Sequence, residues 1–255
     1  MGYLDGDALA GGSRMKWKIL AVSALAILAS GSFAHPEPPP RSERAPPSAG
    51  PGSGPAPFWA TGWKPGYAVP SAWTPRYFHY ETRYAAVVET NELIFETFAD
   101  GTASWIARAL PQDLLAKPDE CLNWRWSADT LPSLTEREDT LTGDVFAARV
   151  YVFGEFEGGE PFGFNYVWTT QKRQGDYWKS PWSDNKLMAL RRGKNASRAL
   201  VAESRSVIAD VSRAYGKTPV RIDGIALMTD AEGSDSIAAA RISLPKFGAC
   251  DLPIS

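Results

Sequence analysis

Charged side chains inside otherwise apolar segments are the residues of this sequence most able to do chemistry. Arg125 lies between Trp124 and Trp126, and Arg149 lies in the run Ala-Ala-Arg-Val-Tyr at residues 147–151. Others within or beside such segments are Asp144, Arg205, Asp210 and Asp230. A buried charge is costly unless it is paired. These residues therefore either form ion pairs that join two sheets, or converge on one face. There an arginine fork and carboxylates would bind sugar hydroxyls or a carboxylated ligand.

A second candidate site is the segment at residues 174–182, where large rings lie in a loop that contains Gly and Pro. The rings are Tyr177, Trp178 and Trp182. Flat apolar rings match the C–H face of a pyranose, and rigid aromatic side chains lose little entropy on binding. The loop is thus a candidate sugar-stacking platform, and the alternative is packing over the end of the sandwich. We expect Trp178, with charged neighbours, to be exposed, and Trp182, which follows a proline, to be packed.

Two acidic segments have spacings that can serve a metal or a catalytic site. The first follows a predicted strand and consists of Asp230, Glu232 and Asp235. Such an oxygen-rich loop can hold Ca²⁺, although its spacing is not that of an EF-hand, and the alternative is a solvated loop without any cofactor. The second has roughly the E-x-D-x-x-E spacing of some jelly-roll glycosidases and consists of Glu155, Glu157 and Glu160. Two glycines interrupt this segment, so its alternative is a polar hairpin tip.

Composition excludes several other classes of site. Of the 2 His, His35 falls in a proline-rich stretch, which leaves His79 as the candidate imidazole and excludes a His-cluster zinc site. Ser133, Ser180 and Ser204 lie in no nucleophile-elbow context, and no phosphate-binding glycine loop occurs. The 27 Lys+Arg and 29 Asp+Glu give a net charge of −2 without a basic stripe. Nucleic acid is therefore not an expected partner.

The N-terminal residues have the pattern of a secretory signal peptide. Two lysines precede an apolar run at residues 19–29, and Ser32 and Ala34 favour cleavage after Ala34. The run is shorter than the roughly 20 residues that a membrane span needs. We expect residues 1–34 to be removed, with Met15 rather than the first methionine as the start, and the mature chain to be periplasmic or secreted without a transmembrane span. An uncleaved N-terminal anchor is the alternative.

Composition divides the rest of the chain into three parts. Residues 35–57 are rich in proline, which fixes φ and removes a donor, and are predicted to form an extended linker. Residues 58–84 are rich in aromatics interleaved with Pro and Gly, and are predicted to form an irregular wrap over one sheet or a ligand platform. Residues 85–255 form the predicted main domain. In an oxidising compartment its two cysteines, Cys121 and Cys250, form a disulfide or remain two isolated thiols.

The main domain is predicted to be an antiparallel β-sandwich of jelly-roll type. Strand-like segments occur at residues 85–90, 93–98, 103–110, 121–128, 146–153, 163–170, 186–191, 220–229 and 236–244. The first two flank Asn91-Glu92 as a hairpin. In the segment 146–153, alternation places Arg149, Tyr151 and Phe153 opposite a face that carries Phe146, Ala148, Val150 and Val152. One short helix is predicted at residues 206–215, ended by Gly216.

Several motifs in order are similar to a known bacterial family. They are LNWRW (122–126), GDVFAARVYVF (143–153), FNYVWTT (164–170), ESRSVIADVSRAYG (203–216) and GIALMTD (224–230). Together these resemble the family catalogued as domain of unknown function 3047. The resemblance implies an exported, single-domain, mostly β protein. The family has no established activity that the resemblance could imply for this chain. The chain departs from the family pattern at Gly143-Asp144-Val145 and at residues 230–233, which weakens any acid-dependent site there.

Three functions follow as hypotheses. The first is an exported binding module for a carbohydrate or envelope glycan, without catalysis, because no complete catalytic constellation is present. The second is an envelope structural or assembly protein, to which the proline-rich linker and the aromatic wrap point. The third is an enzyme that acts on a polysaccharide through paired carboxylates, either Glu155 with Glu157 or Asp144 with Asp210.

Overall fold

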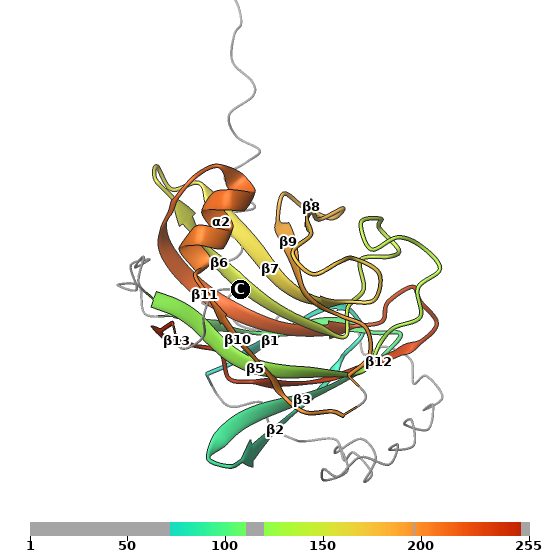
Figure 1. Ribbon diagram of the computed structural model, residues 1–255. Helices are drawn as coiled ribbons and strands as arrows, with labels where there is room; N and C mark the ends of the chain where they lie inside the picture. The colour runs from blue at the N-terminus through green and yellow to red at the C-terminus, as the bar shows by residue number, and fades with distance from the viewer. Residues whose placement is uncertain (1–71, 111–119, 196, 251–255) are drawn as a thin grey trace, which may run out of the picture. The chain divides into compact units, whose positions relative to one another are not determined.

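The computed structural model describes residues 72–110, 120–195 and 197–250, and the statements below concern this part of the chain. The predicted signal peptide, the proline-rich linker and residues 58–71 of the predicted wrap lie outside the described residues. The described part forms two β-sheets stacked as layers, with one helix, α2 (Val207–Tyr215), at one end of the larger sheet (Figure 1). No helix among the described residues is long and apolar enough to span a membrane.

The larger sheet has seven strands in the order β1-β4-β11-β6-β7-β9-β8. Their bounds are β1 (Thr74–His79), β4 (Ala103–Ala109), β11 (Pro219–Asp230), β6 (Ala148–Phe156), β7 (Pro161–Thr169), β9 (Lys186–Arg192) and β8 (Tyr177–Lys179). Neighbouring strands are antiparallel except for β7 and β9, which run parallel.

The smaller sheet has the order β10-β5-β12-β3-β2, with β13 also paired to β5, and all of its pairs are antiparallel. Its strands are β10 (Val201–Arg205), β5 (Glu120–Thr130), β12 (Ile237–Ser243), β3 (Glu92–Asp100), β2 (Arg83–Glu89) and β13 (Lys246–Ala249). The hairpin of β2 and β3 turns at Thr90 and Asn91, whose φ angles are 48° and 65°. Two positive φ angles match the twist of the flanking strands, and asparagine tolerates them well.

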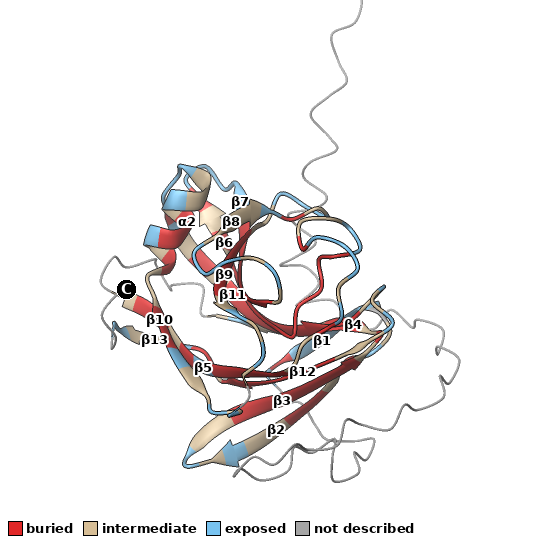
Figure 2. Cartoon of the chain, turned by 45° about the vertical axis from the view of Figure 1, so that its right-hand side comes forward, coloured by how far each residue is buried: buried red, intermediate tan, exposed pale blue. Residues whose placement is uncertain are grey.

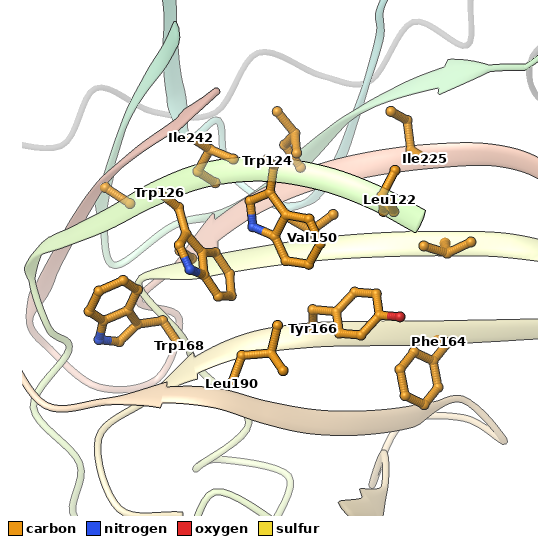
Figure 3. Close-up of a cluster of buried hydrophobic side chains, with 14 of the residues drawn as sticks. Leu122, Trp124, Trp126, Val150, Phe164, Tyr166, Trp168, Leu190, Ile225 and Ile242 are labelled. Carbon is orange, nitrogen blue, oxygen red and sulfur yellow. The ribbon is translucent and has the colours of Figure 1, made fainter. Parts of the chain in front are cut away.

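The main core lies between the two sheets, and Figure 2 shows buried residues running along the strands of both. Aromatic side chains of β5 and β7 meet there (Figure 3). The ring centroids of Trp124 and Tyr166 are 5.2 Å apart, and those of Trp126 and Trp168 are 5.6 Å apart. The Trp126 indole Nε1 donates to Glu203 Oε1 at 2.9 Å, so its polar atom is satisfied within the core.

The helix is capped at both ends, and of the two caps the glycine was predicted from the sequence. The Ser206 side chain accepts a hydrogen bond from the Ala209 N–H, and Gly216, at φ 68°, donates its N–H to the Ser212 carbonyl. Glycine adopts this left-handed conformation without the strain of a side chain. The apolar face of α2, Val207 and Val211, packs into the main core.

The predicted fold class, an antiparallel β-sandwich of jelly-roll type with one short helix, is confirmed for the described residues. One detail of the alternation was wrong. Phe146 precedes the first residue of β6 and packs with Val167 and Leu187, whereas Ala148, Val150 and Val152 lie in the main core. Four short strands were not predicted, namely β1, β8, β10 and β13. The first of these lies within the segment predicted as an irregular wrap.

Candidate functional site

Alternation along three strands brings aromatic side chains to the outer face of the larger sheet, the face turned away from the smaller sheet. Successive side chains of a strand point to opposite faces. Ile106 on β4 and Val150 and Val152 on β6 lie in the main core. Trp105, Tyr151 and Phe153 therefore lie on the outer face. The edge strand β1 adds Phe78, at an irregularity in its pairing with β4.

These four residues, Phe78, Trp105, Tyr151 and Phe153, are called the aromatic cluster. The ring centroid of Trp105 is 4.9 Å from that of Phe78, 5.2 Å from that of Tyr151 and 5.3 Å from that of Phe153. Phe78 is 47% exposed, Trp105 and Phe153 are half-buried, and Tyr151 is buried. The rings of the cluster are thus most exposed at the β1 edge of the sheet and more buried toward β6.

Next to the aromatic cluster lies a buried group of charges, the Arg149 cluster, made of Arg149, Asp144, Asp230 and Tyr151. Arg149 Nη2 is 2.7 Å from Asp230 Oδ2, in a close ion pair that lacks hydrogen-bond alignment. Arg149 Nη1 donates to Asp144 Oδ2 at 3.4 Å and to the Tyr151 hydroxyl at 3.3 Å, and Nη2 donates to the Asp144 carbonyl. The guanidinium also lies 4.4 Å from the centroid of the Phe146 ring. This arginine therefore ties β6 to the end of β11 and to the segment before β6.

Burial dominates the electrostatics of the Arg149 cluster. Burial raises the pKa of Asp144, and raises the pKa of Asp230 to about 7, even though Arg149 opposes both changes. Burial acts to lower the pKa of Arg149, but the two carboxylates raise it above its ordinary value. Burial also raises the pKa of Tyr151 to about 12. Burial, with a smaller contribution from the charge of Asp144, thus leaves Asp230 close to its titration point at neutral pH.

The unfolding free energy of the native protein should contain a contribution from Asp230 that falls as the pH rises. The pKa of Asp230 is raised from 3.8 to about 7 by folding, so this stabilisation is complete below about pH 4 and is lost as the pH rises through 7. Because a single proton is involved, the contribution of Asp230 to the free energy of unfolding changes by at most about 1.4 kcal/mol per pH unit. In urea unfolding across this range, the free energy of unfolding of the native protein minus that of Asp230→Asn should fall as the pH rises. The exposed Asp184→Asn variant is the control, and parallel curves for native protein and Asp230→Asn would contradict the assignment.

The charges of α2 and β10 form a separate group on the inner side of the larger sheet. Arg205 binds Asp210 through Nε and Nη2, at 2.9 and 2.6 Å. The hydroxyl of Tyr166, a residue of the main core, donates to Asp210 Oδ2 at 2.9 Å, and that of Tyr177 lies 3.4 Å from Oδ1. Asp144 and Asp210 are therefore on opposite faces of the sheet and do not act as a catalytic pair.

The structure reverses the expectation for the two tryptophans of the loop at residues 174–182. Trp182 is 64% exposed. Trp178 is half-buried on the outer face, where it packs against Phe146 and Leu187. The reason is that residues 177–179 form the short edge strand β8, which pairs with β9 and directs Trp178 onto the sheet. The charged neighbours of Trp178 do not keep it exposed.

The remaining candidates from the sequence lie apart from these groups. Arg125 forms an ion pair with Glu92 at 2.6 Å on the outer face of the smaller sheet. Glu155 is paired with Arg221 at 3.1 Å, while Glu157 is exposed beside a glycine turn with φ angles of 84° and 79°. These two glutamates therefore do not converge on one ligand position.

The acidic loop after β11 does not gather its carboxylates around one point. Asp230 is directed to Arg149 and to the backbone N–H of Phe146, rather than toward Glu232 and Asp235. Within the described ranges, no group of three or more His, Cys, Asp or Glu side chains is placed to hold a metal ion. Cys121 and Cys250 are joined in a disulfide with a Cα–Cα distance of 5.0 Å.

A comparison with known protein families matches residues 71–243 to the family described as Protein of unknown function (DUF3047). The chain belongs to this family. The match confirms the resemblance inferred from the five motifs and begins earlier than they do, so that it includes β1. All residues of the aromatic cluster and the Arg149 cluster lie within the matched region, whereas β13 and Cys250 lie beyond it.

Among curated proteins, no match to this DUF3047 member is found. Solved structures with similarity include a cellulase derived from Cel12A of Rhodothermus marinus, at 12% identity and a TM-score of 0.39 over 73% of this chain and 95% of that chain. The family 11 xylanase from Neocallimastix patriciarum has 11% identity and a TM-score of 0.38, over 71% and 94%. The family 11 carbohydrate-binding module from Clostridium thermocellum has 9% identity and a TM-score of 0.35, over 71% and 92%. Likenesses this weak support no inference about ligand or activity.

The sequence contained a signal for part of the aromatic cluster. Alternation in β6 already placed Tyr151 and Phe153 on the face of Arg149, opposite Val150 and Val152. Trp105 was not singled out, because a tryptophan in an alternating strand is ordinarily a core residue. Phe78 lies in the segment 58–84, whose aromatic residues were predicted to form an irregular wrap or a ligand platform. The strand β1 that positions it was not predicted, because that segment is rich in Pro and Gly.

Proposed function

We propose that this DUF3047 member binds a carbohydrate on the outer face of its larger sheet, where Phe78, Trp105 and Phe153 form the stacking surface and the buried Tyr151 supports them. The observation that carries the proposal is the convergence of Phe78, Trp105, Tyr151 and Phe153, from three strands, on one face. Rings set in strands are held in place before a ligand arrives, so that little side-chain entropy is lost on binding. Their apolar surfaces match the C–H faces of pyranose rings.

The proposed activity is binding without catalysis. A glycosidase needs two carboxyl groups that reach either side of the scissile bond. On this face the carboxylates of Asp144 and Asp230 are 4% and 2% exposed, and both are engaged by Arg149. Groups so placed support the structure of the face rather than contact with a substrate. The proposal includes export to the periplasm or the exterior, which the disulfide supports because such bonds persist in oxidising compartments.

Changing Phe78 to Ala should weaken carbohydrate binding by roughly 3- to 10-fold, the loss expected when one aromatic stacking contact is removed. Because Phe78 is 47% exposed, the thermal unfolding temperature should change little. Affinity electrophoresis against a panel of neutral and acidic polysaccharides identifies a polymer that the native protein binds. Titration of the native protein and the variant with that polymer measures the effect.

The matched control is Trp182→Ala, which removes a 64% exposed ring from the loop between β8 and β9. It should leave affinity unchanged. A loss confined to Trp182→Ala would move the site to that loop and reject the sheet face. If the native protein bound none of these polysaccharides, the proposed function itself would be rejected.

A further inference from the structure

Arg76 places a positive charge directly on the aromatic cluster. It pairs in register with Trp105 across β1 and β4. Its guanidinium carbon lies 5.2 Å from the ring centroid of Phe78 and 5.6 Å from that of Trp105. A guanidinium within about 6 Å of a ring centroid is attracted by the ring face. Arg76 is exposed, so the rings hold its charge at the surface of the proposed site.

Among the described residues, two other cations contact rings on the outer face of the larger sheet, and each of them, unlike Arg76, has a carboxylate partner. Arg149 lies over Phe146 and is neutralised by two buried aspartates. Lys172 lies 5.4 Å from the Trp178 ring and forms an ion pair with Asp139 at 2.8 Å. No carboxylate in the described part of the chain forms an ion pair with Arg76. Its fork of donors is therefore available to a ligand.

Glu81, the acidic residue that follows β1 in the sequence, interacts with a side chain on the opposite face. Tyr77, the next residue of β1, pairs with Ser104 and so points to the opposite face, and its hydroxyl interacts with Glu81. Asp144 and Asp230, on the same face, are buried against Arg149, and Glu155, which alternates with Phe153 onto this face, is paired with Arg221. Among the described residues, Arg76 is therefore the charged side chain in contact with the open end of the aromatic cluster.

From this arrangement we infer that the ligand is a carboxylated polysaccharide, with a uronate-type carboxylate on Arg76 and its sugar ring on Phe78 and Trp105. The inference rests on the proposed carbohydrate-binding function and names the class of its ligand. Arginine suits this role because its planar fork matches the two oxygens of a carboxylate. The rings of Phe78 and Trp105 beside the guanidinium would contact the sugar ring at the same time.

The test compares binding to polygalacturonate and alginate with binding to the same polymers after reduction of their carboxyl groups. The native chain should bind at least one acidic polymer, and should bind its reduced form about tenfold more weakly. Arg76→Gln should lose this preference while still binding the reduced polymer as the native protein does. Arg76→Lys should recover part of it, because the charge returns without the fork. Arg173→Gln, which removes an exposed charge from the β7–β8 loop, is the matched control and should behave like the native protein.

The outcomes separate the two claims. Equal binding of acidic and reduced polymers, with Arg76→Gln unchanged, would overturn the carboxylate assignment and leave the proposed function standing. An equal loss of the preference in Arg173→Gln would overturn it as well, since net charge alone would then explain it. Failure to bind any acidic, reduced or neutral polysaccharide would reject the proposed function and this inference together.

Discussion

Replacing Arg149 by Met should lower the unfolding free energy by roughly 3–5 kcal/mol, the usual result of removing one partner of a buried ion pair. Arg149, Asp144 and Asp230 have side chains 4%, 4% and 2% exposed. Without the guanidinium, two carboxylates would remain in a site that water hardly reaches. Methionine keeps much of the side-chain volume, so that the effect of the lost charge is separated from that of a cavity. Urea denaturation at neutral pH measures it.

The matched control is Arg125→Met, which breaks the ion pair with Glu92. The two side chains of that pair are 45% and 27% exposed. Water can solvate the remaining glutamate, and the loss should be below about 1 kcal/mol. Combining Arg149→Met with Asp144→Asn and Asp230→Asn should recover part of the stability, because no unpaired charge then stays buried. Equal effects of the two single arginine variants would contradict the burial of the Arg149 cluster.

The main strands could be predicted because alternation and burial agree within them. In β5, the core positions Leu122, Trp124 and Trp126 alternate with Asn123 and Arg125, and the structure has the same two faces. The helix was equally clear, since apolar residues recur at helix spacing and Gly216 follows the last of them. The four short strands β1, β8, β10 and β13 were not predicted, because a strand such as β8 at Tyr177–Lys179 is too short to show a period.

The charged residues of the Arg149 cluster could each be predicted from the sequence, but their grouping could not. Each charge could be recognised as unusual from its apolar neighbours, but whether two charges meet depends on strand order and on the face that each occupies. Arg149 and Asp230 are far apart in the sequence and meet because β6 and β11 are neighbours. Asp144 and Asp210, which looked equally suitable as a pair, are separated by the sheet. Strand order comes from long-range packing, which a single sequence does not reveal.

The disulfide should give the second large effect, since reduction is expected to lower the unfolding free energy by up to roughly 5 kcal/mol. The bond joins residues 129 apart, and in a chain-entropy treatment a closed loop of that length removes about this much freedom from the unfolded chain. The folded protein should change little, because Cys250 follows β13, which lies along β5 with Gly248 opposite Cys121. The stabilisation therefore acts mainly on the unfolded state.

Urea denaturation of the full chain, with and without reductant, measures this effect. The Cys121→Ala, Cys250→Ala double variant is the control: its stability should match that of the reduced native protein within about 1 kcal/mol and should not respond to reductant. Alanine is suited to position 121 because the cysteine there is fully buried, and a serine would place a hydroxyl in the core. Thiol titration of the unreduced protein in denaturant should detect no free cysteine. Two reactive thiols, or a native chain that reductant leaves unchanged, would show that the bond is not formed or does not stabilise the fold.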